Sequence, residues 1–206
     1  LSVAPTTPAT LKINGDHTIQ GNGGVIVLVK GSVIEEHTDA DDKLTLKATS
    51  TCSSQSCSMT LKGDGYIDVN FDNRAYVIAD HHIRLENRSK TGTADGWWIV
   101  NDAGLLTVST LVTGACAWYI ESDSEDNRIS LSEDAGCVNG SGPVTLKAGE
   151  LDCQCGTTFC TTGKLTWKSV ASGGGTTEPR IRTKSTSLAT FGLGGASTCS
   201  CSTDCP

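Results

Sequence analysis

The sequence is built from short runs in which apolar and polar residues alternate, and Gly, Asn, Asp or Ser closes each run. Such runs are typical of β-strands separated by turns. No window has the apolar spacing of an amphipathic helix. The pattern predicts an all-β protein. Its expected strands begin near Leu11, Val25, Leu44, Met59, Tyr66, Ala75, Ile83, Trp97, Leu105, Trp118, Ile129, Val144, Leu165, Ile181 and Leu188.

A tripeptide of Thr, then Leu or Trp, then Lys recurs without a fixed period. It begins at Thr10, Thr45, Thr60, Thr145 and Thr166. These irregular spacings exclude a solenoid of exact period but allow a degenerate parallel β-helix, whose coils vary in length through insertions in the turns. An antiparallel sandwich or jelly roll also has many short strands and remains the alternative.

The segment 63–87, GDGYIDVNFDNRAYVIADHHIRLEN, favours the β-helix, because its strands are very short and its turns carry Asn and Asp. It resembles the successive faces of a parallel β-helix of the pectate-lyase or adhesin type. The runs LTLKAT at 44–49 and VTLKAG at 144–149 resemble the rungs of secreted haemagglutinin-type solenoids. This resemblance covers residues 10–150 and implies a degenerate parallel β-helix.

From Cys153 onward the composition shifts to Cys, Gly, Ser and Thr. We therefore expect three parts: an extended segment at 1–13, a β domain at 14–150, and a disulfide-stapled cap or lobe at 151–206. Pro5 and Pro8 keep the first segment out of a helix. Its Leu-Lys-Ile run is the candidate donor strand for another copy of the chain.

Composition excludes two classes of partner and indicates a compartment. A net charge of −7 without a basic cluster argues against nucleic acid. The longest apolar run, residues 25–29, is too short to span a bilayer. Ten cysteines, an even number, predict secretion into an oxidising environment. Because the chain begins at Leu1 with no apolar leader, we expect that a signal peptide has been removed.

We expect all ten cysteines to form structural disulfides rather than a metal site, because the one-residue gaps in two similar clusters do not suit zinc. Cys52 is expected to pair with Cys57, and Cys116 with Cys137. The other six are expected to join the two clusters to each other. They are Cys153, Cys155 and Cys160 in the first cluster and Cys199, Cys201 and Cys205 in the second.

The sequence predicts no enzyme and no cofactor. Its four histidines have no nucleophile in a recognised frame, and no phosphate-loop or zinc-protease motif occurs. The acidic residues at 35–42 favour a solvated loop. If calcium binds, Asp39, Asp41 and Asp42 are the candidate ligands, because hard cations need several oxygen atoms.

Two adjacent aromatic pairs, Trp97-Trp98 and Trp118-Tyr119, predict one core ring and one exposed or interface ring in each pair, since neighbours in a strand face opposite sides. Core packing of both rings in a strand covered on two sides is the alternative. The candidate interface residues are Leu11, Ile13, Trp97 and Trp98. The candidate glycosylation sites are Asn87 and Asn139 in N-linked acceptor tripeptides and Thr6, Thr7 and Thr10 in the Thr- and Pro-rich start.

These features favour a structural subunit of an extracellular assembly, such as a fibril, a pilus-like filament or a surface coat, that self-associates through β edges. The segment 23–38 resembles the opening strands of donor-strand pilins, which implies a homo-oligomer or filament. One alternative is a carbohydrate-binding adhesin module, with glycans as partners. The other is a polysaccharide-degrading β-helix enzyme, disfavoured because no basic residue is paired with the acidic clusters.

Overall fold

The structure is a computed structural model in which residues 7–38, 41–49, 58–121, 127–132, 136–154, 157–172, 175–183 and 190–193 are described. These residues form β-strands and no helix. Neighbouring strands in both large sheets pair in parallel, as in β10 (Trp97–Val100) with β13 (Ala117–Ile120). The predicted parallel β-helix is therefore confirmed, and the antiparallel sandwich or jelly roll is wrong.

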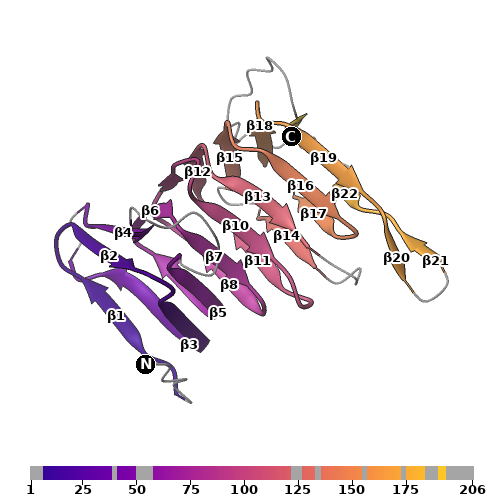
Figure 1. Cartoon of the computed structure of the whole chain (residues 1–206). Coiled ribbons are helices and arrows are strands. Elements are labelled where there is room, and N and C mark those ends of the chain that lie inside the picture. The colour runs from indigo at the N-terminus through magenta and orange to yellow at the C-terminus, as the bar shows by residue number, and fades with distance from the viewer. Residues whose placement is uncertain are drawn as a thin grey trace.

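The larger sheet supplies two of the three faces of the solenoid (Figure 1). Face A consists of β7 (Tyr76–Ala79), β10, β13, β16 (Val144–Lys147) and β19 (Leu165–Lys168). Face B consists of β1 (Thr10–Ile13), β8 (His82–Leu85), β11 (Leu105–Val108), β14 (Arg128–Leu131), β17 (Glu150–Cys153) and β22 (Arg180–Thr183). The long strands β3 (Val25–Glu36) and β5 (Thr60–Asp68) run through both faces.

Face C is the smaller sheet. It consists of β2 (His17–Gly21), β4 (Lys43–Ala48), β6 (Asn70–Arg74), β9 (Lys90–Gly92), β12 (Leu111–Gly114), β15 (Cys137–Gly140), β18 (Thr158–Thr161) and β23 (Thr190–Leu193). The chain visits the faces in turn, so the colour in Figure 1 changes steadily along the stack. An antiparallel hairpin of β20 (Val170–Ser172) and β21 (Gly175–Thr177) projects from the solenoid between β19 and β22.

Two glycines let the long strands turn from face A to face B. The register of β3 shifts between Leu28 and Ser32, where Gly31 has a φ of 88°. Gly63, in the neighbouring β5, has a φ of 116°, and a Cβ atom there would lie 2.0 Å from the Leu28 carbonyl oxygen. Only glycine accommodates both the positive φ and this close approach of two backbones. In the coil that follows β5, a turn between β7 and β8 replaces the continuous strand.

The coil length explains why the Thr-(Leu/Trp)-Lys motif has no fixed period. Thr145 and Thr166, 21 residues apart, pair with each other and mark one coil of face A. Thr45 lies on face C, and Thr60 lies on β5. The motif is thus a strand pattern that occurs on more than one face, and only some of its spacings correspond to a coil.

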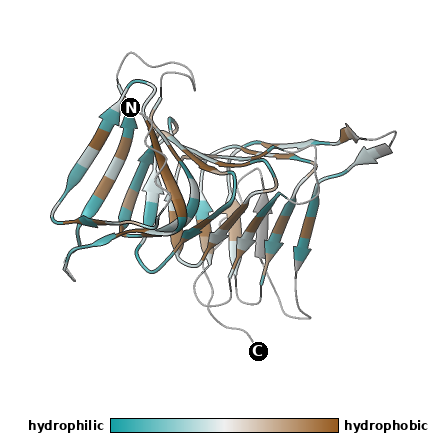
Figure 2. Cartoon of the chain, turned by 90° about the horizontal axis from the view of Figure 1, so that it is seen from below, coloured by the Kyte–Doolittle hydropathy of each residue, from teal (hydrophilic) through white to brown (hydrophobic). Residues whose placement is uncertain are grey.

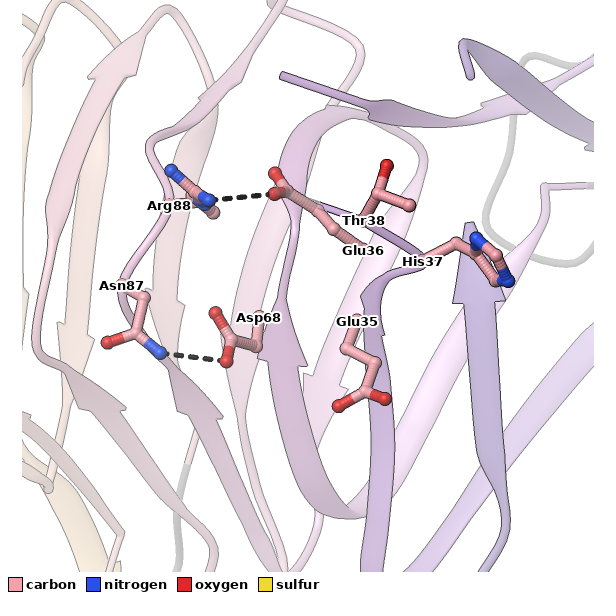
Figure 3. Close-up of a pocket in the computed structure, with 7 residues that line it drawn as sticks. All are labelled: Glu35, Glu36, His37, Thr38, Asp68, Asn87 and Arg88. Atoms are coloured by element: carbon pink, nitrogen blue, oxygen red, sulfur yellow. Dashed lines mark hydrogen bonds and ion pairs between the residues drawn. The ribbon is translucent and has the colours of Figure 1, made fainter. Parts of the chain in front are cut away.

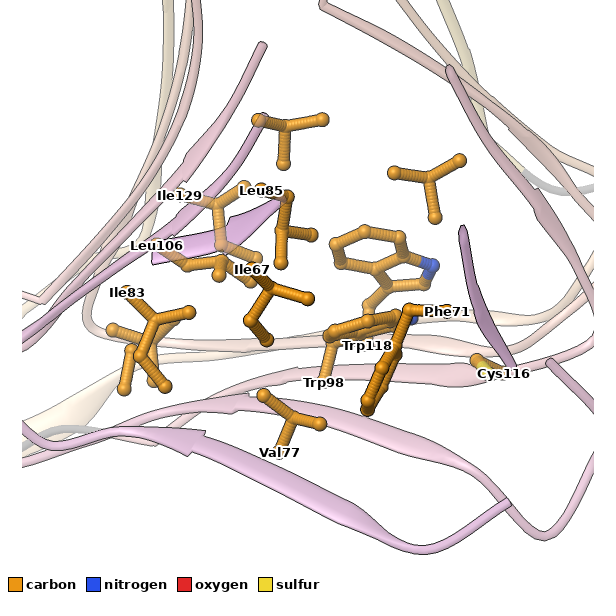
Figure 4. Close-up of a cluster of buried hydrophobic side chains, with 14 of the residues drawn as sticks. Ile67, Phe71, Val77, Ile83, Leu85, Trp98, Leu106, Cys116, Trp118 and Ile129 are labelled. Atoms are coloured by element: carbon orange, nitrogen blue, oxygen red, sulfur yellow. The ribbon is translucent and has the colours of Figure 1, made fainter. Parts of the chain in front are cut away.

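The core consists of inward side chains stacked in columns along the axis. One column on face A runs through Leu61, Val77, Trp98, Trp118 and Val144, which pair successively and are at most 3% exposed. The rings of Trp98 and Trp118 lie 5.8 Å apart (Figure 4). Each coil therefore buries its apolar side chains against the coils on either side.

Each predicted strand start among the described residues lies in or beside an observed strand, and the alternation of polar and apolar residues is visible in Figure 2. The start predicted at Leu188 lies outside the described residues. The prediction missed β2, β6, β9, β15, β17, β18 and β21. The run that begins at Leu105 contains two strands, β11 and β12. β9 is Lys-Thr-Gly, which has no strand pattern of its own and is held by its neighbours β6 and β12. Pairing between coils therefore overrides local propensity.

Strands from the segments predicted at the two ends belong to the solenoid in the part of the chain that the structure describes. β1, the expected donor segment, pairs with β3 of its own chain, from Thr10 beside Val33 to Ile13 beside Glu36. Both sheets continue beyond residue 150, through β18 on face C and β22 on face B. In the described residues, the solenoid therefore extends through part of the expected cap.

Candidate functional site

The two ends of the solenoid expose large apolar side chains that point along its interior columns. Leu11 on β1 is 42% exposed, although it pairs with Ile34, which is 1% exposed. Trp167 on β19 is 46% exposed, although it pairs with Leu146, which is completely buried. Paired residues in parallel strands face the same side of the sheet. Both exposed side chains therefore occupy interior positions that no further coil of the described residues covers.

Other interior positions at the ends share this partial burial. The apolar side chains that pack against the core without being buried are Ile19 on β2, Ile26 on β3, Leu165 on β19 and Ile181 on β22. In the described sheets, β2 and β23 are the outermost strands of face C, while β1 and β22 are the outermost strands of face B. An outermost strand presents backbone N–H and C=O groups along one edge, which suits pairing with a further strand.

The end that follows β18 is basic in an acidic protein. Between residues 157 and 183, the described residues include four basic side chains, Lys164, Lys168, Arg180 and Arg182, and one acidic side chain, Glu178. The whole chain has a net charge of −7. A basic end of this kind repels a like end and favours contact with an acidic surface, most strongly at low ionic strength.

A polar pocket of about 320 Å³ lies where β3, β5 and β8 end, close to the first coil (Figure 3). The Asn87 amide donates a hydrogen bond to the Asp68 carboxylate at 2.7 Å. Arg88 forms an ion pair with Glu36 at 2.9 Å. The lining residues are Glu35, Glu36, His37, Thr38, Asp68, Asn87 and Arg88.

The pocket contains both hydrogen-bond donors and acceptors. Its three carboxylates and the Asn87 carbonyl oxygen accept, while Arg88 and Thr38 can donate. Glu35 also forms an ion pair with Lys12 of β1 at 3.4 Å, which links the pocket to the first coil. Such a mixture suits a ligand with several hydroxyl groups better than an apolar one.

Lys90 contacts the backbone of Arg88, a pocket residue, and was not identified from the sequence. It pairs with Phe71 and Val112 in an interior column of face C and is completely buried. Its ammonium group donates hydrogen bonds to the carbonyl oxygens of Glu86, at 2.9 Å, and Arg88. Burial lowers the pKa of Lys90 from its ordinary value of 10.5 to about 7. A lysine in an apolar column thus fixes the backbone turn at residues 86–88 through hydrogen bonds to two of its carbonyl oxygens.

Two of the three predicted calcium ligands lie in the described part of the chain. Asp41 is exposed and Asp42 is 7% exposed, while Asp39 lies outside the described residues. Among the residues that are described, no group of three or more His, Cys, Asp or Glu side chains could hold a metal ion. Calcium needs several oxygen ligands around one point, and the described side chains provide no such cluster.

The cysteine prediction is wrong for two residues. Cys116 and Cys153 are buried free thiols, so the expected Cys116–Cys137 bridge does not form. Their side chains lie in the core, and burial raises the pKa of both thiols to about 12. Cys137 and Cys160 are disulfide-bonded. The remaining cysteines, Cys52, Cys57, Cys155, Cys199, Cys201 and Cys205, lie outside the described residues.

The interface prediction is corrected at two of its four residues. Trp98 is completely buried and Ile13 is 4% exposed, so both belong to the core. Trp97 is partly exposed and stacks on Tyr76, with ring centroids 6.0 Å apart. The expected division of each aromatic pair into one inner and one outer ring is confirmed, since Trp118 is also buried and its neighbour is only partly so.

The candidate glycosylation sites lie at the surface where they are described. Asn87, Asn139, Thr7 and Thr10 are exposed, and Thr6 lies outside the described residues. A glycan on Asn87 would replace a hydrogen of the amide that donates to Asp68. Modification there would therefore alter the polar pocket.

The described residues contain no helix that could cross a bilayer. Comparisons with protein-family models, with curated proteins and with solved structures find no match for this chain.

Proposed function

We propose that the chain is a structural subunit of an extracellular fibril, pilus-like filament or surface coat, and that copies associate end to end through their terminal coils. The observation that carries this proposal is the exposure of Leu11 and Trp167 at interior positions of opposite ends. A second copy would bury both side chains and pair the outermost strands.

The two ends differ in sequence, so the contact is heterologous. A heterologous contact that does not close into a ring produces an open filament. The basic end formed by residues 157–183 and the acidic net charge of the chain favour this head-to-tail orientation over contact between two like ends. The disulfide bonding of Cys137 and Cys160 supports an oxidising, extracellular location.

The test compares Leu11→Lys and Trp167→Lys with Leu111→Lys. Leu111 is 40% exposed, like Leu11, but lies on β12 in the middle of face C. We expect the wild type and Leu111→Lys to form filaments in negative-stain microscopy and large species in light scattering. Each end variant should raise the critical concentration at least about tenfold, because it removes an apolar contact. A wild type that remains monomeric at high concentration would overturn the proposal.

A second function, glycan binding, is favoured by the polar pocket. The Asp68, Asn87 and Arg88 side chains offer paired donors and acceptors at the surface, which suits a sugar with adjacent hydroxyl groups. A glycan array followed by calorimetry tests it. Binding should be lost in Asp68→Ala and retained in Leu111→Lys. An array without any ligand for the wild type would exclude this function.

A further inference from the structure

We infer that, in the end-to-end contact proposed above, β22 of one copy pairs in parallel with β1 of the next and continues the columns of face B, so that Arg182 lies beside Thr10. This inference rests on the proposed function. It adds which strands meet and in which register, and both can be derived from the pairing within one chain.

The outward column of face B connects these two residues through every coil. Successive pairs join Thr10 to Val33, Tyr66, Arg84, Thr107, Ser130, Asp152 and Arg182. Among the described residues, Thr10 and Arg182 are therefore the first and last members of one continuous column. A further coil at either end would extend this column.

Face C has a corresponding inward column. It begins at His17 on β2, passes through Lys90 and Val112, and reaches Phe159 on β18, which is paired in turn with β23. If a second copy continues both columns, β22 of one copy pairs with β1 of the next, and β23 pairs with β2 in the same contact. The edges of two faces then acquire partners in the same contact.

The three-faced cross-section selects this register. Alternation of inward and outward side chains allows slips of two residues, which would place Arg182 beside Lys12. Such a slip moves a strand by about 7 Å along its own direction. The strands of the other two faces run in other directions. The same shift of one copy would therefore move the inward columns of those faces out of line with the columns of the next copy. A slip along face B would also place two cations side by side, because Lys12 and Arg182 are 55% and 54% exposed.

The geometry allows a direct test by disulfide cross-linking. Neighbouring parallel strands lie about 4.8 Å apart, within the Cα separation that a disulfide accepts. Thr10 is exposed, and Arg182 is mainly solvent-exposed, with a surface ion pair to Glu150 at 3.2 Å. Replacing either residue by cysteine should therefore leave the fold intact, which circular dichroism of each variant would verify.

The experiment mixes equal amounts of the full-length variants Thr10→Cys and Arg182→Cys under mild oxidation. We expect a covalent dimer on non-reducing gels that each variant alone, and the wild type, does not give above background. The double variant Thr10→Cys/Arg182→Cys should give a ladder of covalent oligomers. The matched mixture of Lys12→Cys with Arg182→Cys reports the slipped register and should give no dimer.

The outcomes separate the inference from the proposed function. A dimer from the Lys12→Cys mixture alone would overturn the register and leave end-to-end assembly standing. A dimer from Arg182→Cys alone would show that two like ends meet and would overturn the head-to-tail pairing. If the protein forms filaments in microscopy but no mixture gives a cross-link, the copies meet through other strands, and the inferred pairing of β22 with β1 is overturned. A wild type that is monomeric in light scattering would overturn the proposed function itself.

Discussion

The middle and terminal coils of the solenoid have the same pattern of residues but different burial. Trp98 and Trp167 both lie on face A and point into the interior. Trp98 is completely buried between Phe71 and Trp118, with ring centroids 6.1 Å and 5.8 Å away, whereas Trp167 is 46% exposed. The difference shows that the neighbouring coils, not the strand's own sequence, create the core.

The largest effect is expected for Trp98→Ala in the middle of the stack. The substitution leaves a cavity among the aromatic rings and should lower the free energy of unfolding by about 3–5 kcal/mol. Chemical denaturation monitored by circular dichroism measures it. A loss below about 1 kcal/mol would show that the middle coils do not depend on their neighbours for burial.

A pH effect of at most about 5 kcal/mol is expected from Lys90, which lies in an interior column. Its pKa is about 7 in the folded state against 10.5 ordinarily, so between these values the unfolded state holds a proton that the folded state has released. Stability should therefore be highest above pH 10.5, fall as the pH falls to about 7, and change no further on this account below it.

Denaturation at a series of pH values checks this expectation. Lys90→Met removes the titrating group and should abolish the decline between pH 10.5 and 7. It should also be no less stable than the wild type near pH 6, because a buried charge is replaced by an apolar chain of similar length. A variant with the same pH profile as the wild type would assign the effect to another group.

A smaller effect is expected at a buried corner. Asn73 is completely buried; its amide donates to the Trp97 carbonyl oxygen at 3.0 Å and accepts from the Ala75 N–H at 3.2 Å. Asn73→Ala leaves these backbone groups without their partner and should cost about 1–3 kcal/mol. Asn14→Ala, at an exposed position between β1 and β2, is the control and should change stability by less than about 0.5 kcal/mol. Equal effects at the two positions would contradict the comparison.

The smallest effect on the stability of the monomer is expected for Trp167→Ala. Its side chain is already half in water, so the free energy of unfolding should fall by about 1 kcal/mol or less. Measurement at a concentration below assembly isolates this term. A loss as large as that of Trp98→Ala would mean that Trp167 belongs to the core of the single chain.

Much of the fold could be predicted from local pattern, because alternation and turn residues are properties of a few neighbouring positions. The strands at Val25, Trp97 and Val144 are examples. β9 and β17 could not be predicted in this way, because their pairing partners lie about twenty residues away in the adjacent coils. The candidate sites were harder still. The polar pocket joins residues from three coils, and nothing near Lys90 in the sequence indicates that it points inward.

The sequence by itself determined the class of fold, since its alternating runs specify strands with one inward face and exclude helices. It also predicted that one ring of each adjacent aromatic pair enters the core, and the structure decided that these rings are Trp98 and Trp118. Only the tertiary structure decided that Leu11 and Trp167 remain exposed while Ile34 and Leu146 are buried. The physical reason is that an apolar side chain in a solenoid is covered by the next coil, and the position of a coil in the stack is not encoded in its own residues.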